Sequence, residues 1–88
     1  MTLHIDWKQQ DLSTMSDMDT RAHHIYHQNI QRGMTPFEVF TAAQTLYQQT
    51  FEEAFFEGGE VFVKTMLYKE VATKAAYMHM VSTTEVTA

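Results

Sequence analysis

The sequence predicts a small all-α protein in which three helices and a short N-terminal arm form one domain. Two observations predict this fold: a strong helix-start signal at residues 34–38, and apolar residues that recur at helical spacing before and after it. A chain of 88 residues is long enough for one domain with a modest core. We expect an arm and linker over 1–15, a helical domain over 16–82 and a frayed tail over 83–88.

The arm comes first in the chain. Residues 2–8 alternate between apolar and polar side chains, which is the period of a β-strand, and Leu3, Ile5 and Trp7 share one side. We therefore expect a short strand or a loose arm. A strand needs a partner, and the candidates are the same arm in a second copy, the C-terminal tail, and the sheet edge of another protein.

The first helix is expected over 17–32. Ser16 and Asp19 have the spacing of an N-cap residue and an acidic third position, and Gly33 is typical of the residue that follows a helix. At about 100° per residue, the apolar side chains of this segment fall on one side of the helix. They are Met18, Ala22, Ile25, Tyr26 and Ile30.

The sequence MTPFE at residues 34–38 predicts the start of a second helix, over about 36–57. Thr35 is placed to cap the helix, Pro36 to occupy its first position, and Glu38 to close a capping box. The apolar side chains of this helix spread over about half of its circumference, whereas one neighbouring helix covers about a third. They are Phe37, Phe40, Ala43, Leu46, Tyr47, Phe51, Ala54 and Phe55.

Gly58 and Gly59 interrupt the chain, and a third helix is expected over 60–82. Apolar residues occur all around this helix, which is typical of a helix buried on most sides. The competing interpretation is a β-hairpin over 55–64 with the glycine pair as its turn. Residues 68–80 favour a helix, and we expect the second and third helices to form a long hairpin.

The predicted helices carry more apolar surface than one copy can cover, and large exposed apolar patches mark partner surfaces. We therefore expect a homo-oligomer, either a dimer or a closed ring. The wide apolar side of the second helix is the predicted interface. Its interface residues are Phe37, Phe40, Tyr47, Phe51 and Phe55.

Charge and composition exclude several classes of protein. The formal net charge is −5 with only six lysines and arginines, which argues against direct binding to nucleic acid. No apolar run approaches the roughly 18–20 residues of a membrane helix, and the N-terminus lacks the features of a signal peptide. There is no cysteine to form a disulfide or a thiolate metal site. We expect a cytoplasmic protein.

Three histidines lie close together in the first helix. His23 and His27 are four residues apart, which lets two imidazoles reach one ion, but the zincin pattern requires a glutamate where this chain has His24. This is a weak signal for metal, and an ordinary solvent-facing side of the helix is the interpretation we prefer. A third interpretation is contact with an anion or a protein, because Arg21 and Arg32 make this helix locally basic.

Nothing in the sequence predicts catalysis. There is no cysteine, no serine in a nucleophile elbow and no phosphate-binding loop, so we expect neither an enzyme nor a cofactor. We expect an adaptor or inhibitor that contacts a larger protein. The alternatives are an oligomer that sequesters a small anionic ligand at a subunit interface, an acidic nucleic-acid mimic and a histidine-based metal-binding protein. The residues predicted to contact the partner are Leu3, Ile5, Trp7, Arg21, His23, His24, His27 and Phe56.

Overall fold

The computed structural model describes the backbone of residues 1–87 and the side chains of residues 1–84. The elements are one turn of 3-10 helix, η1 (Trp7–Gln9), and three α-helices, α1 (Met18–Gln31), α2 (Pro36–Glu57) and α3 (Gly59–Thr87). Residues 1–87 contain no β-strand. The predicted all-α class is therefore confirmed.

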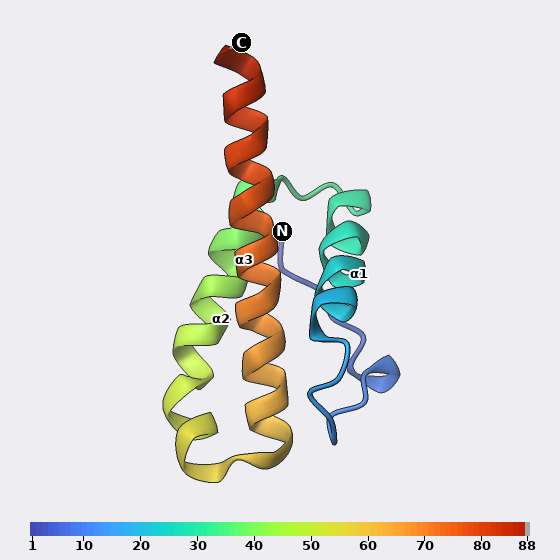
Figure 1. Ribbon diagram of the computed structural model, residues 1–88, viewed down its shortest axis with the longest axis vertical. Helices are drawn as coiled ribbons and strands as arrows, with labels where there is room; N and C mark the ends of the chain where they lie inside the picture. The colour runs from blue at the N-terminus through green and yellow to red at the C-terminus, as the bar shows by residue number, and fades with distance from the viewer. Residues whose placement is uncertain (88) are drawn as a thin grey trace.

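The three helices lie side by side, with α3 in contact with both others (Figure 1). α2 and α3 form the predicted helical hairpin, and α1 packs mainly on α3 rather than on α2. α3 is the longest helix, at 29 residues against 22 in α2, and its C-terminal turns extend beyond the ends of its neighbours (Figure 1). The molecule is therefore elongated, with extents of 45 × 24 × 24 Å.

The turn between α2 and α3 is a helix break. Gly58 and Gly59 have φ angles of 64° and 59°, which a residue with a Cβ rarely adopts. α2 continues to Glu57 and α3 begins at Gly59, so the alternative of a β-hairpin over 55–64 is wrong. α3 begins at Gly59 and continues past residue 82, where we expected the helix to end and a frayed tail to begin. Ala88, the last residue of that expected tail, lies outside the described residues.

The start of α2 has the predicted capping box. The Thr35 hydroxyl accepts a hydrogen bond from the Glu38 amide at 3.1 Å, and the Glu38 carboxylate accepts one from the Thr35 amide at 3.1 Å. Pro36 occupies the first helical position. The hydrogen bond from the Thr35 amide, with a smaller contribution from the Thr35 side chain, holds the pKa of the Glu38 carboxyl below its usual value.

The start of α1 differs from the prediction. The residue before the helix is Asp17 rather than Ser16, and Asp17 has a left-handed φ of 56° without a capping hydrogen bond from its side chain. The Ser16 amide instead donates to the Thr14 hydroxyl at 3.0 Å. The segment that enters α1 is therefore a tight loop and not a regular helix cap.

The arm is not a strand. The backbone of residues 1–6 has no regular secondary structure, and residues 7–9 form η1. The predicted alternation still exists, because Ile5 is buried and Leu3 and Trp7 pack against the core while His4 and Lys8 are exposed. No second strand lies beside it, and the arm packs on its own helices.

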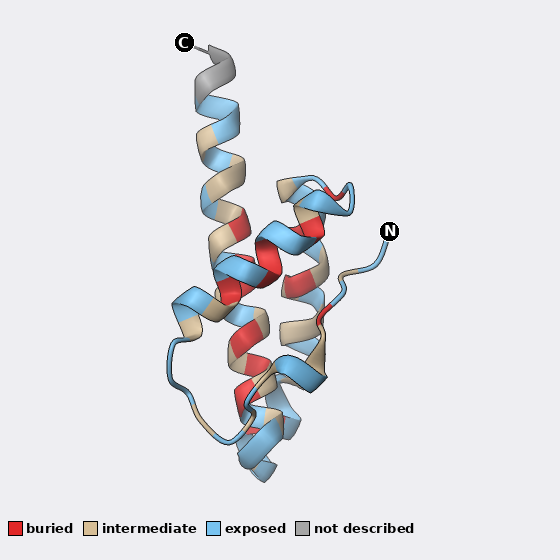
Figure 2. Ribbon diagram, turned by 90° about the vertical axis from the view of Figure 1, so that its right-hand side faces the viewer, coloured by how far each residue is buried: buried red, intermediate tan, exposed pale blue. Residues whose placement is uncertain are grey.

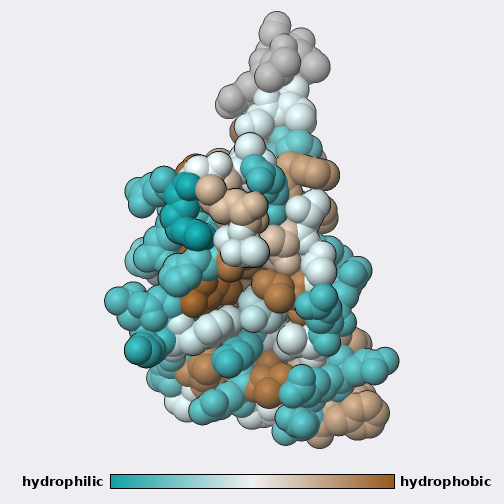
Figure 3. All heavy atoms as spheres, turned by 180° about the vertical axis from the view of Figure 1, so that it is seen from behind, coloured by the Kyte–Doolittle hydropathy of each residue, from teal (hydrophilic) through white to brown (hydrophobic). Residues whose placement is uncertain are grey.

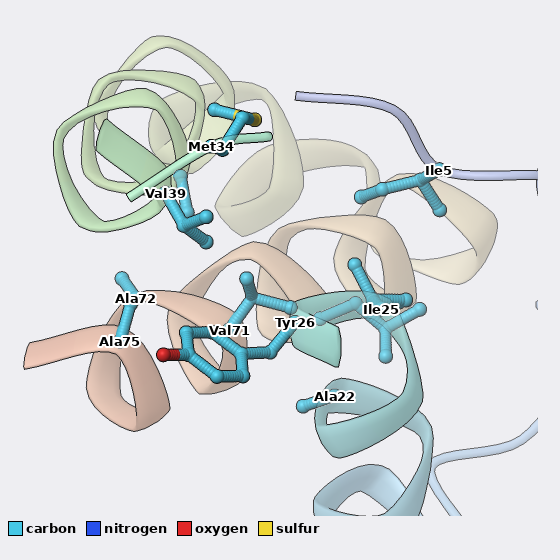
Figure 4. Packing of buried hydrophobic residues seen from close by; sticks show 11 residues of the cluster. Ile5, Ala22, Ile25, Tyr26, Met34, Val39, Val71, Ala72 and Ala75 are labelled. Carbon is cyan, nitrogen blue, oxygen red and sulfur yellow. The ribbon is translucent and has the colours of Figure 1, made fainter. Parts of the chain in front are cut away.

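The core lies where the arm and the three helices meet (Figures 2 and 4). Tyr26 extends from α1 across Val71 toward Ala75 of α3, and its burial raises the pKa of its phenol (Figure 4). This core includes Ile5, Ala22, Ile25, Met34, Val39, Ala43, Leu67 and Ala72. Towards the hairpin turn, the buried side chains are few and small: Ala54, Val63 and Thr65.

None of the described helices is long and apolar enough to cross a membrane.

Candidate binding surface

The five residues predicted as an interface lie along one side of α2, and we call them the aromatic face: Phe37, Phe40, Tyr47, Phe51 and Phe55. At 100° per residue they fall within about 80° of one another. Phe37, Phe51 and Phe55 are exposed, while Phe40 and Tyr47 are half-buried. The Tyr47 and Phe51 rings are in edge contact, with their centroids 5.6 Å apart. The helix therefore presents a continuous row of aromatic rings.

A groove between α2 and α3 runs beside the aromatic face. Part of it is a cavity of about 320 Å³, lined by Phe40, Gln44 and Tyr47 of α2 and by Lys69, Ala72, Thr73 and Ala76 of α3. Two hollows of about 360 Å³ each continue along α2, one beside Tyr47 and Phe51 and one between Phe51 and Phe56. The apolar surface thus extends from the middle of α2 to the hairpin turn.

The end of the hairpin, which we call the tip, carries the two most exposed phenylalanines of the chain, Phe55 and Phe56. Phe55 and Phe56 are 78% and 82% exposed, and their ring centroids are 5.7 Å apart. Apolar atoms are visible at the lower end of the molecule, where α2 turns into α3 (Figure 3). Glu52 lines the same hollow as these rings, and Glu53, Glu57 and Glu60 are exposed residues of the same end of the hairpin.

The opposite end of the hairpin has a second group of exposed apolar side chains. The Phe37 ring lies 5.3 Å from the ring of His79, and Tyr77 and Met80 are both more than 60% exposed. Phe37 was a predicted interface residue, but the exposure of Tyr77 and Met80 was not predicted, because we expected α3 to be buried on most sides. Tyr77 and Met80 lie level with the first turns of α2, on a part of α3 that no described neighbour buries.

The three histidines of α1 are all exposed, as predicted. The rings of His23 and His27 lie 4.3 Å apart, centroid to centroid. Partial desolvation and the charges of His27, Lys74 and His24 lower the pKa of His23 below its usual 6.5. Among the described residues, no group of three or more histidine, aspartate or glutamate side chains is arranged to hold a metal ion. The described part of the chain therefore brings together two imidazoles without a third ligand.

Arg21 is not available to a partner. Its guanidinium donates to the Gln10 side chain at 2.9 Å and to the carbonyl oxygens of Asp11, Thr14 and Ser16 at 2.7, 3.2 and 3.1 Å. It therefore holds the loop that precedes α1. Three aspartates and His24 line the adjacent 370 Å³ cavity, so this side of α1 is not a strip of free positive charge for an anion.

The arm residues are also not free. Ile5 is buried, and Trp7 packs edge-on against Tyr68 at 5.6 Å, with the Lys64 ammonium 5.0 Å from its ring. The expectation that Leu3, Ile5 and Trp7 remain open for a partner is therefore not met in this conformation. The intramolecular apolar contact is the physical reason, because the arm covers core residues of α1 and α3 that water would otherwise reach.

A comparison with protein-family models gives no match, and comparisons with curated proteins and with solved structures give none either.

Proposed function

We propose that this protein acts by contact rather than by catalysis, as an adaptor or inhibitor that self-associates and binds a larger protein. The observation that carries the proposal is the row of exposed aromatic rings along α2, which ends in Phe55 and Phe56 at the tip. Aromatic side chains are enriched in protein interfaces, and a few of them supply most of the binding free energy.

The surroundings of the tip support a protein partner of defined chemistry. Stable interfaces have an apolar centre and a polar rim. At the tip, the rings of Phe55 and Phe56 form such a centre, and the carboxylates of Glu52, Glu53 and Glu57 form such a rim. The matching surface on a larger protein is an apolar pocket with lysine or arginine residues at its edge, because opposite charges guide and orient the two surfaces.

The test compares two baits in extracts of the native host. One bait is the untagged wild-type protein and the other carries Phe55→Ser and Phe56→Ser, and captured proteins are quantified by mass spectrometry. We expect at least one protein to bind the wild type and to be lost from the double variant. The candidate is then purified and its affinity for both baits is measured by calorimetry.

A matched control is Gln31→Ala, because Gln31 is an exposed residue at the end of α1 remote from the tip (Figure 1). This variant should capture the same proteins as the wild type. The proposal is wrong if the wild type neither self-associates nor binds any protein that the tip variant fails to bind.

A further inference from the structure

We propose that a second copy of this chain occupies the groove between α2 and α3. In the resulting dimer, α2 of each copy lies in the groove of the other. The two-fold axis runs along the helices, so that both hairpin tips lie at the same end. This inference rests on the proposed binding role of the aromatic face and names its occupant.

The spacing of side chains on the two walls of the groove favours a helix as occupant. Along each wall, successive residues are three or four positions apart, which is the spacing of a seam between packed helices. The α2 seam is Phe37, Phe40, Gln44, Tyr47, Phe51 and Phe55, and the α3 seam is Phe62, Met66, Lys69, Thr73, Ala76 and Met80.

Both seams lie on the side of the hairpin away from α1. The cavity between them is lined only by α2 and α3, with no residue of α1 or of the arm. α3 therefore packs against α1 and the arm on one side and against α2 on another, and its seam faces the open cavity.

The exposed apolar area is the size that a dimer needs. Five seam residues, Phe37, Phe51, Phe55, Phe62 and Met80, are between 39% and 78% exposed. At about 200 Å² for each large side chain, they expose on the order of 500 Å². A stable interface buries about 800 Å² on each partner, of which roughly 60% is apolar. The seam therefore supplies the apolar part of one standard interface.

Charge selects a second copy over other helical partners. Lys69 stands in the groove wall, and Glu52 stands beside Phe51 on α2. Neither the ammonium of Lys69 nor the carboxylate of Glu52 contacts an opposite charge among the described residues. A second copy carries both groups. In a two-fold dimer, Lys69 of each copy therefore pairs with Glu52 of the other, which gives two ion pairs.

The hairpin register indicates which way the second copy points. Residues equally far from the turn lie level, so Glu52 is level with Thr65 and one helical turn from Lys69. Side chains tilt toward the N-terminus of their helix, which moves the Lys69 and Glu52 groups toward one another. The Lys69 and Glu52 groups of different copies approach one another only when the two copies of α2 run in the same direction, with both tips at one end.

Light scattering across a wide concentration range tests the dimer directly. We expect the mass of two chains for the wild type and of one chain for Phe51→Glu, with the helical circular dichroism of the variant unchanged because Phe51 is already 47% exposed. A protein that remains monomeric at high micromolar concentration overturns the inference.

A charge exchange tests the contact between copies. Lys69→Glu and Glu52→Lys should each weaken the dimer by about tenfold or more, and the double variant should recover most of that loss. Lys74→Glu is the control, because Lys74 lies near His23 on the α1 side of α3 and should leave the dimer unchanged. Equal dimerisation of all four variants contradicts the proposed arrangement.

A single spin label tests the direction. The chain has no cysteine, so Glu57→Cys places one label at each tip. Tips at the same end give a label-to-label distance well below the length of α2, which is about 33 Å at 1.5 Å per residue. A distance longer than α2 refutes the parallel arrangement. If the protein is monomeric yet loses a partner protein on mutation of Phe55 and Phe56, this inference and the proposed self-association fail, and the proposed contact with a larger protein stands.

Discussion

Asn29 of α1 and His4 of the arm exchange two hydrogen bonds across 25 residues of sequence. The His4 amide donates to the Asn29 Oδ1 atom at 2.9 Å, and the Asn29 Nδ2 atom donates to the His4 carbonyl at 2.8 Å. Asn29 Nδ2 also donates to the Ile25 carbonyl, and Oδ1 accepts from Arg32. This fully buried amide therefore uses all four of its hydrogen-bonding positions, and it pairs with the arm as a neighbouring strand would.

Replacing Asn29 with alanine should release the arm. The change leaves the His4 amide and carbonyl without their partner, and we expect a loss of about 2–3 kcal/mol in the free energy of unfolding. Urea denaturation measures this loss, and the fluorescence of Trp7, the single tryptophan, reports the arm. Gln31→Ala on the same helix serves as the control and should change neither the free energy of unfolding nor the Trp7 fluorescence. Unchanged Trp7 emission in Asn29→Ala would show that the hydrogen bonds of Asn29 do not hold the arm.

Replacing Arg21 with alanine should loosen the segment before α1 without unfolding the protein. The guanidinium binds three carbonyl oxygens of residues 11–16, but the site is half-exposed, so we expect a cost of only about 1 kcal/mol. Limited proteolysis should cleave this segment faster in the variant. His24→Ala removes an exposed neighbour and should behave like the wild type. Equal cleavage rates in Arg21→Ala and the wild type would mean that the loop is held by other contacts.

Replacing Thr35 with alanine should weaken the start of α2. The variant loses the hydroxyl that accepts from the Glu38 amide, and a lost N-cap costs about 1 kcal/mol. The control is Thr45→Ala, because the Thr45 hydroxyl only donates to the carbonyl one turn earlier within the same helix. Thermal unfolding should show a lower Tm for Thr35→Ala than for Thr45→Ala. The reverse order would show that the capping box does not determine where α2 begins.

The pKa of His23 should depend on its neighbour His27. Desolvation and the charge of His27 lower the pKa of His23, so His27→Gln should raise that pKa toward its usual value. Because the unfolded chain takes up this proton first as the pH falls, His23 destabilises the folded state as the pH drops through about 6.5. Nuclear magnetic resonance titration of the imidazole protons measures the shift. A His23 pKa that does not respond to His27→Gln would exclude the coupling.

The sequence was most informative where the interaction is local. Thr35 and Glu38 are three residues apart, and the geometry of a helix start is complete within that distance, so the capping box is as predicted. The aromatic face was equally predictable, because helical periodicity alone places Phe51 and Phe55 on one side of α2, and the structure shows both side chains exposed. Self-association through that face stays a prediction.

Two of the errors concern residues whose partners lie outside their own helix or segment. The alternation of Leu3, Ile5 and Trp7 correctly divided the arm into inner and outer sides, but the pattern could not reveal that the side chain of Asn29 takes the place of a strand. Arg21 appeared to be a free surface charge, because its partners are backbone carbonyls that have no sequence signature.

By itself, the sequence determined the three helices, the hairpin and the excess of aromatic surface on α2, since each follows from residues within a few positions of one another. Only the tertiary structure decided the path of the arm, the role of Arg21 and the exposed end of α3. The physical reason is that hydrogen bonds and burial between distant segments depend on how the finished helices pack, and helical periodicity carries no information about that packing.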